Sequence, residues 1–130
     1  MKKELLIFGA NGALGKGASE VFLQKDYDKI FLFDSKAEVK SRNKKVETVN
    51  VNDLSLEANV ADAFKSVKPG KDKIFFLFNT IGGYFGGKNI WETEVNDFEK
   101  MFNMNLMTSF LIAKHFSLLV KNSAGLTKLS

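Results

Sequence analysis

Short apolar runs alternate with longer stretches of helical spacing along the whole chain. Four short runs contain Leu, Ile, Val or Phe and are each followed by Gly, Asp or Asn, as expected of strands that end in a turn. They predict strands over residues 5–8, 30–33, 46–51 and 74–78. Strands that alternate with helices are typical of a parallel α/β sheet.

Helical patterns fill the intervals between these strands. Apolar residues at three- and four-residue spacing predict a helix over residues 12–25 and a long helix over about 96–121. A third helix is expected to begin at Ser55 as its N-cap and to end at Pro69-Gly70. A short helix is also expected over residues 36–42.

The order of these elements predicts the fold. Four strand-helix units followed by an apolar segment at 125–129 indicate one mononucleotide-binding half of a doubly wound sheet and the opening of a fifth strand. The fold class is therefore α/β, a Rossmann-like doubly wound parallel sheet in three αβα layers, truncated after the start of that strand. We expect residues 1–130 to be the N-terminal portion of one such Rossmann domain.

The composition favours a single globular domain. The 130 residues are 45% hydrophobic and 26% charged, with no Cys and one His, so a zinc or thiol site would lack its usual ligands. Every apolar run is shorter than the roughly 18 to 20 residues of a bilayer helix, and the N-terminus lacks a signal-peptide pattern. We expect a soluble cytoplasmic protein with no membrane partner.

The formal charge of +4 raises the question of a nucleic-acid partner. The lysines are scattered over the whole length, and the aromatic residues are mainly Phe inside apolar runs. Nucleic-acid binding usually requires basic residues clustered on one face. The sequence therefore predicts a solvated basic surface and no nucleic-acid partner.

The first candidate site is the turn between the first strand and the first helix. It reads Gly-Ala-Asn-Gly-Ala-Leu-Gly, where bare backbone lets a pyrophosphate approach and the helix amino end favours negative charge. A tight turn without a ligand is the alternative. The cofactor-binding residues predicted here are Gly9, Asn11, Gly12, Ala13, Leu14 and Gly15.

An acidic residue at the end of the second strand suggests which cofactor binds. Asp34 follows Gly15 by nineteen residues. A carboxylate at this place accepts hydrogen bonds from the ribose hydroxyls of NAD and repels the 2′-phosphate of NADP. The alternative is an Asp that caps the next helix. Lys36, Lys40 and Arg42 lie close enough in sequence to stabilise a 2′-phosphate, so NADP stays open beside NAD.

Several motifs in this order resemble those of the short-chain dehydrogenases/reductases, over essentially all 130 residues. The resemblance covers the three glycines of the first turn and an Asp-aliphatic pair that in the family contacts adenine. It also covers Asn-Thr-Ile-Gly after the fourth strand, which resembles the family's Asn-Asn-Ala-Gly. The matching cofactor-binding positions are Gly9, Gly12, Gly15, Asp53, Leu54, Asn79, Thr80 and Gly82.

The chain also departs from the family's pattern. Phe8 stands where the family usually has Thr, and Ala13 replaces a glycine, so the spacing is Gly-x-x-Gly-x-x-Gly. The glycine loop over residues 82–87 resembles that of dihydropteridine reductases, which implies that Tyr84 lines the nicotinamide and substrate pocket. A glycine loop with Tyr84 on the surface is the alternative.

The resemblance implies hydride transfer between nicotinamide and a carbonyl, hydroxyl or imine, with a Tyr-x-x-x-Lys pair as proton donor. Tyr84 and Lys88 match that spacing, but they lie on the glycine loop and not on a predicted helix. By resemblance, Asn105 holds a water of the proton relay and Ser130 falls near the catalytic Ser. Asn105 as a polar residue on a helix face is the alternative.

The sequence therefore predicts the cofactor-binding half of an NAD(P)-dependent oxidoreductase acting on a small carbonyl, hydroxyl or dihydropterin-like substrate. The Tyr-Lys pair is expected beyond residue 130, so these residues alone would not form an enzyme. The apolar surface of the long helix, together with the resemblance, predicts a homodimer or homotetramer. A non-catalytic NAD-binding or regulatory module is the alternative, and an interaction protein without a ligand is a third.

Overall fold

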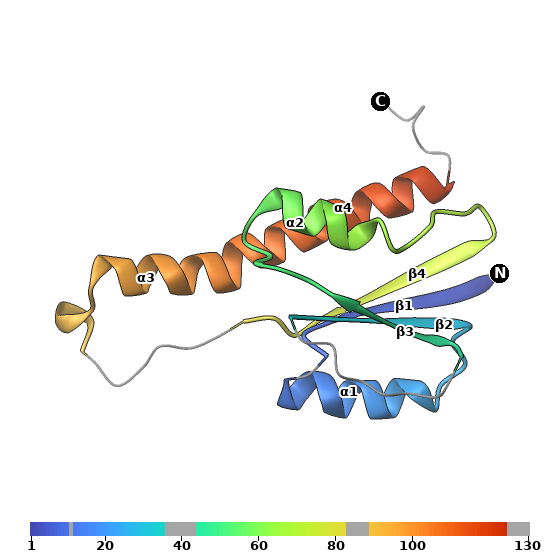
Figure 1. Ribbon diagram of the computed structural model, residues 1–130, viewed down its shortest axis with the longest axis horizontal. Coiled ribbons are helices and arrows are strands. Elements are labelled where there is room, and N and C mark those ends of the chain that lie inside the picture. The colour runs from blue at the N-terminus through green and yellow to red at the C-terminus, as the bar shows by residue number, and fades with distance from the viewer. Residues whose placement is uncertain (11, 36–43, 83–88, 125–130) are drawn as a thin grey trace.

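A four-stranded parallel sheet forms the centre of the computed structural model, which describes residues 1–10, 12–35, 44–82 and 89–124 (Figure 1). The strands are β1 (Lys2–Phe8), β2 (Lys29–Asp34), β3 (Val46–Asn50) and β4 (Lys73–Asn79), in the order β3-β2-β1-β4. All neighbouring strands in this order are parallel. The four predicted strands are confirmed, and their order is that of one half of a doubly wound sheet.

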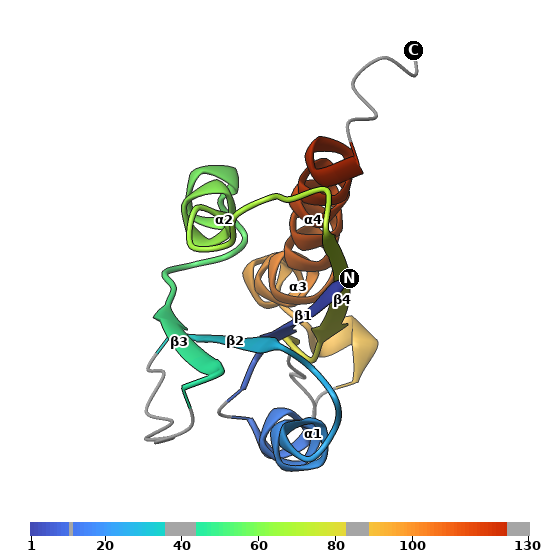
Figure 2. The ribbon, with the colours of Figure 1, turned by 90° about the vertical axis from the view of Figure 1, so that its right-hand side faces the viewer.

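Helices cover both faces of this sheet. They are α1 (Ala13–Leu23), α2 (Glu57–Phe64), α3 (Val95–Phe102) and α4 (Thr108–Ala124), with a 3-10 turn η1 (Ile90–Glu92) and a π turn η2 (Asn103–Met107). Figure 2 shows α1 on one face of the sheet and α2 and α4 on the other. The Rossmann-like, three-layer αβα architecture is therefore confirmed. The helix expected over 36–42 and the strand expected over 125–129 fall outside the described residues.

The alternation of side chains along β1 explains why both faces are covered. Leu5 and Ile7 belong to the core beneath α1, whereas Leu6 and Phe8 belong to the core shared with α2 and α4. All four side chains are buried. A central parallel strand buried on both faces requires an uninterrupted apolar run, which is what the sequence contains.

The long helix predicted over about residues 96–121 is confirmed, and it contains a π turn. The π turn η2 joins α3 to α4, and α3 extends beyond the edge of the sheet (Figure 1). Within the turn, Thr108 Oγ1 donates to the Asn103 carbonyl at 2.8 Å and Asn105 Nδ2 donates to the Met101 carbonyl at 2.9 Å. Side chains that bond to backbone carbonyls compete with the α-helical ladder. The sequence pattern did not predict this π turn.

The start of α2 also differs from the prediction. The Ser55 backbone N–H and hydroxyl both donate to Asp53 Oδ1, at 3.0 and 2.6 Å, so Ser55 closes a turn with Asp53 instead of capping the helix. Leu56 is the N-cap and makes no side-chain cap bond. The helix ends at Phe64, before the Pro-Gly pair that was expected to end it.

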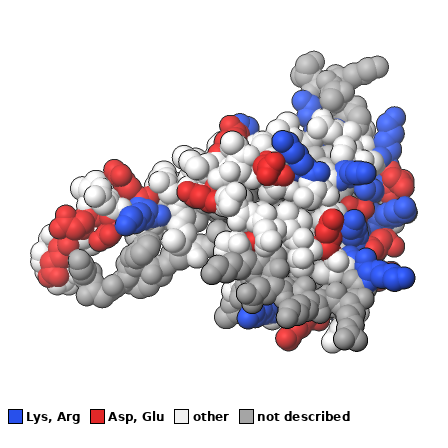
Figure 3. All heavy atoms as spheres, in the orientation of Figure 1, with Lys and Arg blue, Asp and Glu red and all other residues white. Residues whose placement is uncertain are grey.

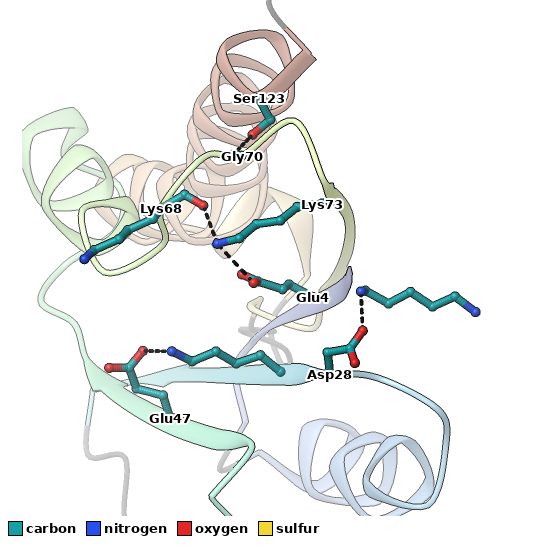
Figure 4. A network of polar contacts seen from close by, with 9 residues as sticks. Glu4, Asp28, Glu47, Lys68, Gly70, Lys73 and Ser123 are labelled. Carbon is teal, nitrogen blue, oxygen red and sulfur yellow. Dashed lines mark hydrogen bonds and ion pairs between the residues drawn. The ribbon is translucent and has the colours of Figure 1, made fainter. Parts of the chain in front are cut away.

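Charged side chains fix the amino ends of the strands (Figure 4). Glu4 Oε2 lies 3.1 Å from Lys73 Nζ, which also donates to the Lys68 carbonyl at 3.0 Å. The Glu4 side chain is only 6% exposed and that of Lys73 only 19%. Lys29 and Glu47 form a more exposed pair at 3.6 Å on neighbouring strands. These contacts lie at the end of the sheet opposite to the loops described next.

Candidate functional site

A pocket of about 680 Å³ lies at the carboxyl ends of the four strands. Each strand contributes to its wall through the loop that follows it, and the far wall comes from α3, η2 and the start of α4. In open α/β sheets, ligands bind at this edge. The lining residues are Gly9, Gly12, Asp34, Ser35, Val51, Asn52, Asp53, Leu54, Ser55, Thr80, Ile81, Gly82, Lys100, Asn103, Met104 and Thr108.

Gly9 is required by the geometry of the turn after β1. Its φ of 84° lies in the region that L side chains rarely adopt, and a β-carbon would overlap the hydroxyl of Thr80. Thr80 Oγ1 lies 2.9 Å from the Phe8 carbonyl oxygen and 3.1 Å from that of Gly9. Thr80 therefore links the loop after β4 to the turn after β1, and no larger residue than glycine fits at position 9.

Gly12 and Gly15 differ in what they do for the fold. A β-carbon at Gly15 would overlap the Gly9 carbonyl oxygen and lie 2.8 Å from its carbonyl carbon, so α1 could not dock on the turn. At Gly12 the backbone is ordinary, with φ −68° and ψ 162°, and the nearest atom to a β-carbon would be 3.4 Å away. Gly12 is exposed and lines the pocket at the amino end of α1. The fold therefore needs glycine at 15 but not at 12.

Two carboxylates line the pocket at the ends of β2 and β3. Asp34 Oδ1 accepts from the Ser35 backbone N–H at 2.7 Å and from its hydroxyl at 3.3 Å. At Asp53, the hydrogen bond from the Ser55 hydroxyl and then that from the Ser55 N–H lower the pKa of the carboxyl below its usual value. Asp53 is therefore ionised at neutral pH.

Asn79, the last residue of β4, and Asn105, in η2, support the wall of the pocket without lining it. Asn79 Oδ1 accepts from the Ile81 N–H at 2.9 Å, and Asn79 Nδ2 lies 3.4 Å from Ser109 Oγ on α4. Asn105 Oδ1 comes so close to Gly82 that a β-carbon there would lie 2.6 Å from it. These contacts hold the loop after β4 against the π turn.

The structure brings seven of the fifteen predicted site residues together in the pocket. Gly9, Gly12, Asp34, Asp53, Leu54, Thr80 and Gly82 line the pocket. Gly15, Asn79 and Asn105 lie behind its wall, and Ala13 and Leu14 form the first turn of α1. Asn11, Tyr84 and Ser130 fall outside the described residues, as do Lys36, Lys40 and Arg42.

Sequence reasoning missed the wall contributed by α3, η2 and α4. This wall consists of Lys100, Asn103, Met104 and Thr108, which belong to no motif. The last three follow Lys100 by three, four and eight residues, and this helical spacing is the only sequence signal that they share one face. Among the residues that the structure describes, no cluster of His, Asp and Glu suits a metal ion. The described helices also include none with the length and hydropathy to cross a membrane.

Comparisons with known proteins agree with this geometry. A family model described as short chain dehydrogenase matches residues 3–126. A short chain dehydrogenase from Burkholderia cenocepacia in complex with NADP superimposes with a TM-score of 0.77 and 20% identity, over 94% of this chain and 50% of that protein. The NADPH-bound carbonyl reductase from chicken fatty liver superimposes with a TM-score of 0.76 and 18% identity, over 92% of this chain and 49% of that protein.

A third structure has a different cofactor. The short chain dehydrogenase from Leptospira borgpetersenii with bound NAD+ gives a TM-score of 0.75 and 20% identity, over 94% of this chain and 47% of that protein. The chain thus spans about half the length of each of these proteins. No curated protein matches it.

Proposed function

The chain belongs to the short-chain dehydrogenase family, and we propose that it is the cofactor-binding part of a nicotinamide-dependent oxidoreductase. The observation that carries this proposal is the presence of glycine at position 12. The fold accepts a side chain at this position, yet the residue is a glycine at the pocket wall where α1 begins. A bare backbone beside a helix amino end suits a pyrophosphate, whose charge the helix stabilises.

The residues of the pocket fit such a cofactor from end to end. Gly12 and the amino end of α1 would hold the pyrophosphate, Asp34 the adenosine ribose, and Asp53 with Leu54 the adenine. When bound, the nicotinamide would exchange a hydride with a small carbonyl, hydroxyl or dihydropterin-like substrate. The acid–base Tyr and Lys of this proposal come from sequence outside these 130 residues. The cytoplasmic location expected from the sequence stays a prediction.

Replacing Asp34 with Ala tests the cofactor preference. We propose NAD over NADP, because a carboxylate at the end of β2 accepts ribose hydroxyls and repels a 2′-phosphate. Loss of hydrogen bonds to a charged group, at about 1.5–3 kcal/mol, predicts a Kd for NAD+ roughly ten- to a hundredfold higher, while NADP+ binding is kept or improved. Calorimetric titration of the full-length polypeptide measures both.

Asp62→Ala is the matched control for this titration. Asp62 is an acid on α2 that pairs with Lys65 3.5 Å away and does not line the pocket. This variant should bind both cofactors as the unmodified protein does. An equal loss of NAD+ and NADP+ affinity in the Asp34 variant would contradict the proposed preference.

A continuous apolar stripe on α3, η2 and α4 supports the proposed homodimer or homotetramer. Its members are spaced three or four residues apart and all are exposed: Val95, Phe98, Phe102, Leu106 and Phe110. Contiguous exposed apolar surface of this kind marks an interface, and we propose that a second copy of the chain covers it.

Two charges placed on this stripe test the proposed assembly. Phe102→Asp with Leu106→Asp should convert the oligomer to monomer at micromolar concentration, because unpaired charges at an apolar interface are strongly unfavourable. Light scattering coupled to size exclusion gives the mass. Replacement of exposed Leu56, the N-cap of α2, by Asp is the control and should leave the mass unchanged. A monomeric unmodified protein would refute the assembly.

A non-catalytic NAD-binding module is the second candidate, and one observation favours it. The chain's one Tyr-x-x-x-Lys spacing, Tyr84 to Lys88, lies on the glycine loop and not on a helix pattern. Oxidation of NADH or NADPH by the full-length polypeptide in the presence of quinonoid dihydropterins and small carbonyls decides between the two. Cofactor binding without turnover would favour the module.

A further inference from the structure

One face of the segment from α3 to α4 is turned toward the pocket. Four residues of this face line the pocket: Lys100 and, three, four and eight residues after it, Asn103, Met104 and Thr108. The exposed apolar stripe, which includes Phe98, lies on a different face of the same segment. The segment therefore has a polar, pocket-lining face that is distinct from its apolar one.

Lys100 is an unusual residue for this segment. The neighbouring residues Glu92, Glu94, Asp97 and Glu99 are acidic, and Figure 3 shows acidic side chains gathered over the arm formed by η1 and α3. Lys100 is the only Lys or Arg between positions 89 and 113. Lys100 nevertheless lines the pocket, so the one basic residue of an acidic arm lies at the candidate cofactor site.

The charges of the pocket wall show why a cation there matters. Among the described lining residues, Asp34 and Asp53 are acidic and Lys100 is the only base. A nicotinamide dinucleotide brings at least two negative phosphate charges to this wall. Two carboxylates on the wall repel these charges, and a positive charge in the same space would offset that repulsion in addition to the amino end of α1.

We propose that Lys100 is a specificity-determining residue that attracts the phosphate groups of the dinucleotide and offsets the two wall carboxylates. This inference rests on the proposed function, because it assumes that the pocket takes a nicotinamide dinucleotide. A Lys ammonium is a compact point charge with three donors and is a common phosphate ligand. None of the ion pairs found among the described residues involves Lys100, so its charge is not already neutralised there.

The test compares ligands with and without phosphate. Calorimetric titration of the full-length polypeptide with NAD+ and with adenosine is carried out for Lys100→Met, Lys100→Arg and Lys121→Met. Lys121 lies in the last turn of α4 and does not line the pocket, so its replacement removes the same charge away from the site. We expect Lys100→Met to raise the Kd of NAD+ roughly tenfold and to leave that of adenosine unchanged.

The other two variants and the salt dependence have expected results of their own. Lys100→Arg should restore most of the NAD+ affinity, Lys121→Met should bind like the unmodified protein, and the effect of Lys100→Met should shrink as salt is raised toward 1 M. Unchanged NAD+ affinity in Lys100→Met, or an equal loss for adenosine, would overturn the inference alone. Absence of NAD+ binding in the unmodified protein would instead overturn the proposed function and this inference together.

Discussion

Replacing Gly12 with Val is expected to abolish cofactor binding while leaving the fold intact. The backbone at Gly12 suits any L residue, and its nearest neighbour would be 3.4 Å from a β-carbon. A branched side chain there would occupy the space beside the first N–H groups of α1, which have no partners within the helix. Losing several charge-assisted hydrogen bonds predicts a Kd for NAD+ roughly a hundredfold higher or more.

Gly15→Val is the matched comparison, because it places the same side chain three residues later. Its β-carbon would overlap the Gly9 carbonyl and lie 3.0 Å from the Ala10 Cα, so the turn and α1 cannot both keep their places. We expect this variant to be insoluble or to melt at a much lower temperature, whereas Gly12→Val should melt like the unmodified protein. Circular dichroism with temperature gives the melting, and calorimetry gives the Kd.

The two variants separate a ligand role from a folding role within one motif. Undiminished NAD+ binding by Gly12→Val would remove the main ground for a cofactor site in this pocket. Destabilisation of Gly12→Val to the level of Gly15→Val would show that position 12 serves the fold after all. Binding lost with the fold retained is the single outcome that supports the proposed function.

The sheet could be predicted from the sequence because its central strands are buried on both faces. Such strands require continuous apolar runs, and the runs at β1 and β2 are bounded by Gly and Asp. The edge strand β4 also has an apolar run, although its Ile74 and Phe76 are exposed. The π turn η2 has no comparable pattern in the sequence. It depends on hydrogen bonds from Thr108 and Asn105 to backbone carbonyls, and polar side chains at these positions also occur on ordinary helix faces.

The candidate site also contains residues that the sequence could predict and residues that it could not. Gly9, Asp34 and Thr80 could be placed together in advance, because the carboxyl ends of parallel strands meet at one edge of the sheet. Lys100 could not, because its place at the pocket depends on where a helix that leaves the sheet comes to lie. The sequence motif also gave Gly12 and Gly15 the same role, and only the contacts of a β-carbon at each position distinguish them.

A large loss of stability is also expected from Lys73→Met at the opposite end of the sheet. Glu4 is a carboxylate with a side chain 6% exposed, and its Oε1 has no hydrogen-bond partner among the described residues. Removing the ammonium 3.1 Å from Oε2 would leave a buried charge without compensation. Breaking a buried pair in this way costs about 3–5 kcal/mol of unfolding free energy. Urea denaturation of the full-length polypeptide measures the change.

Two further variants show whether burial of the charge is the cause. Adding Glu4→Gln to Lys73→Met should recover part of the loss, because the neutral amide no longer requires a cation. Lys65→Met removes a pair with Asp62 whose side chains are 77% and 75% exposed, and it should cost less than about 1 kcal/mol. If Lys73→Met cost no more than Lys65→Met, water would have to reach Glu4, and the Glu4–Lys73 pair would contribute little to the stability of the amino ends of the strands.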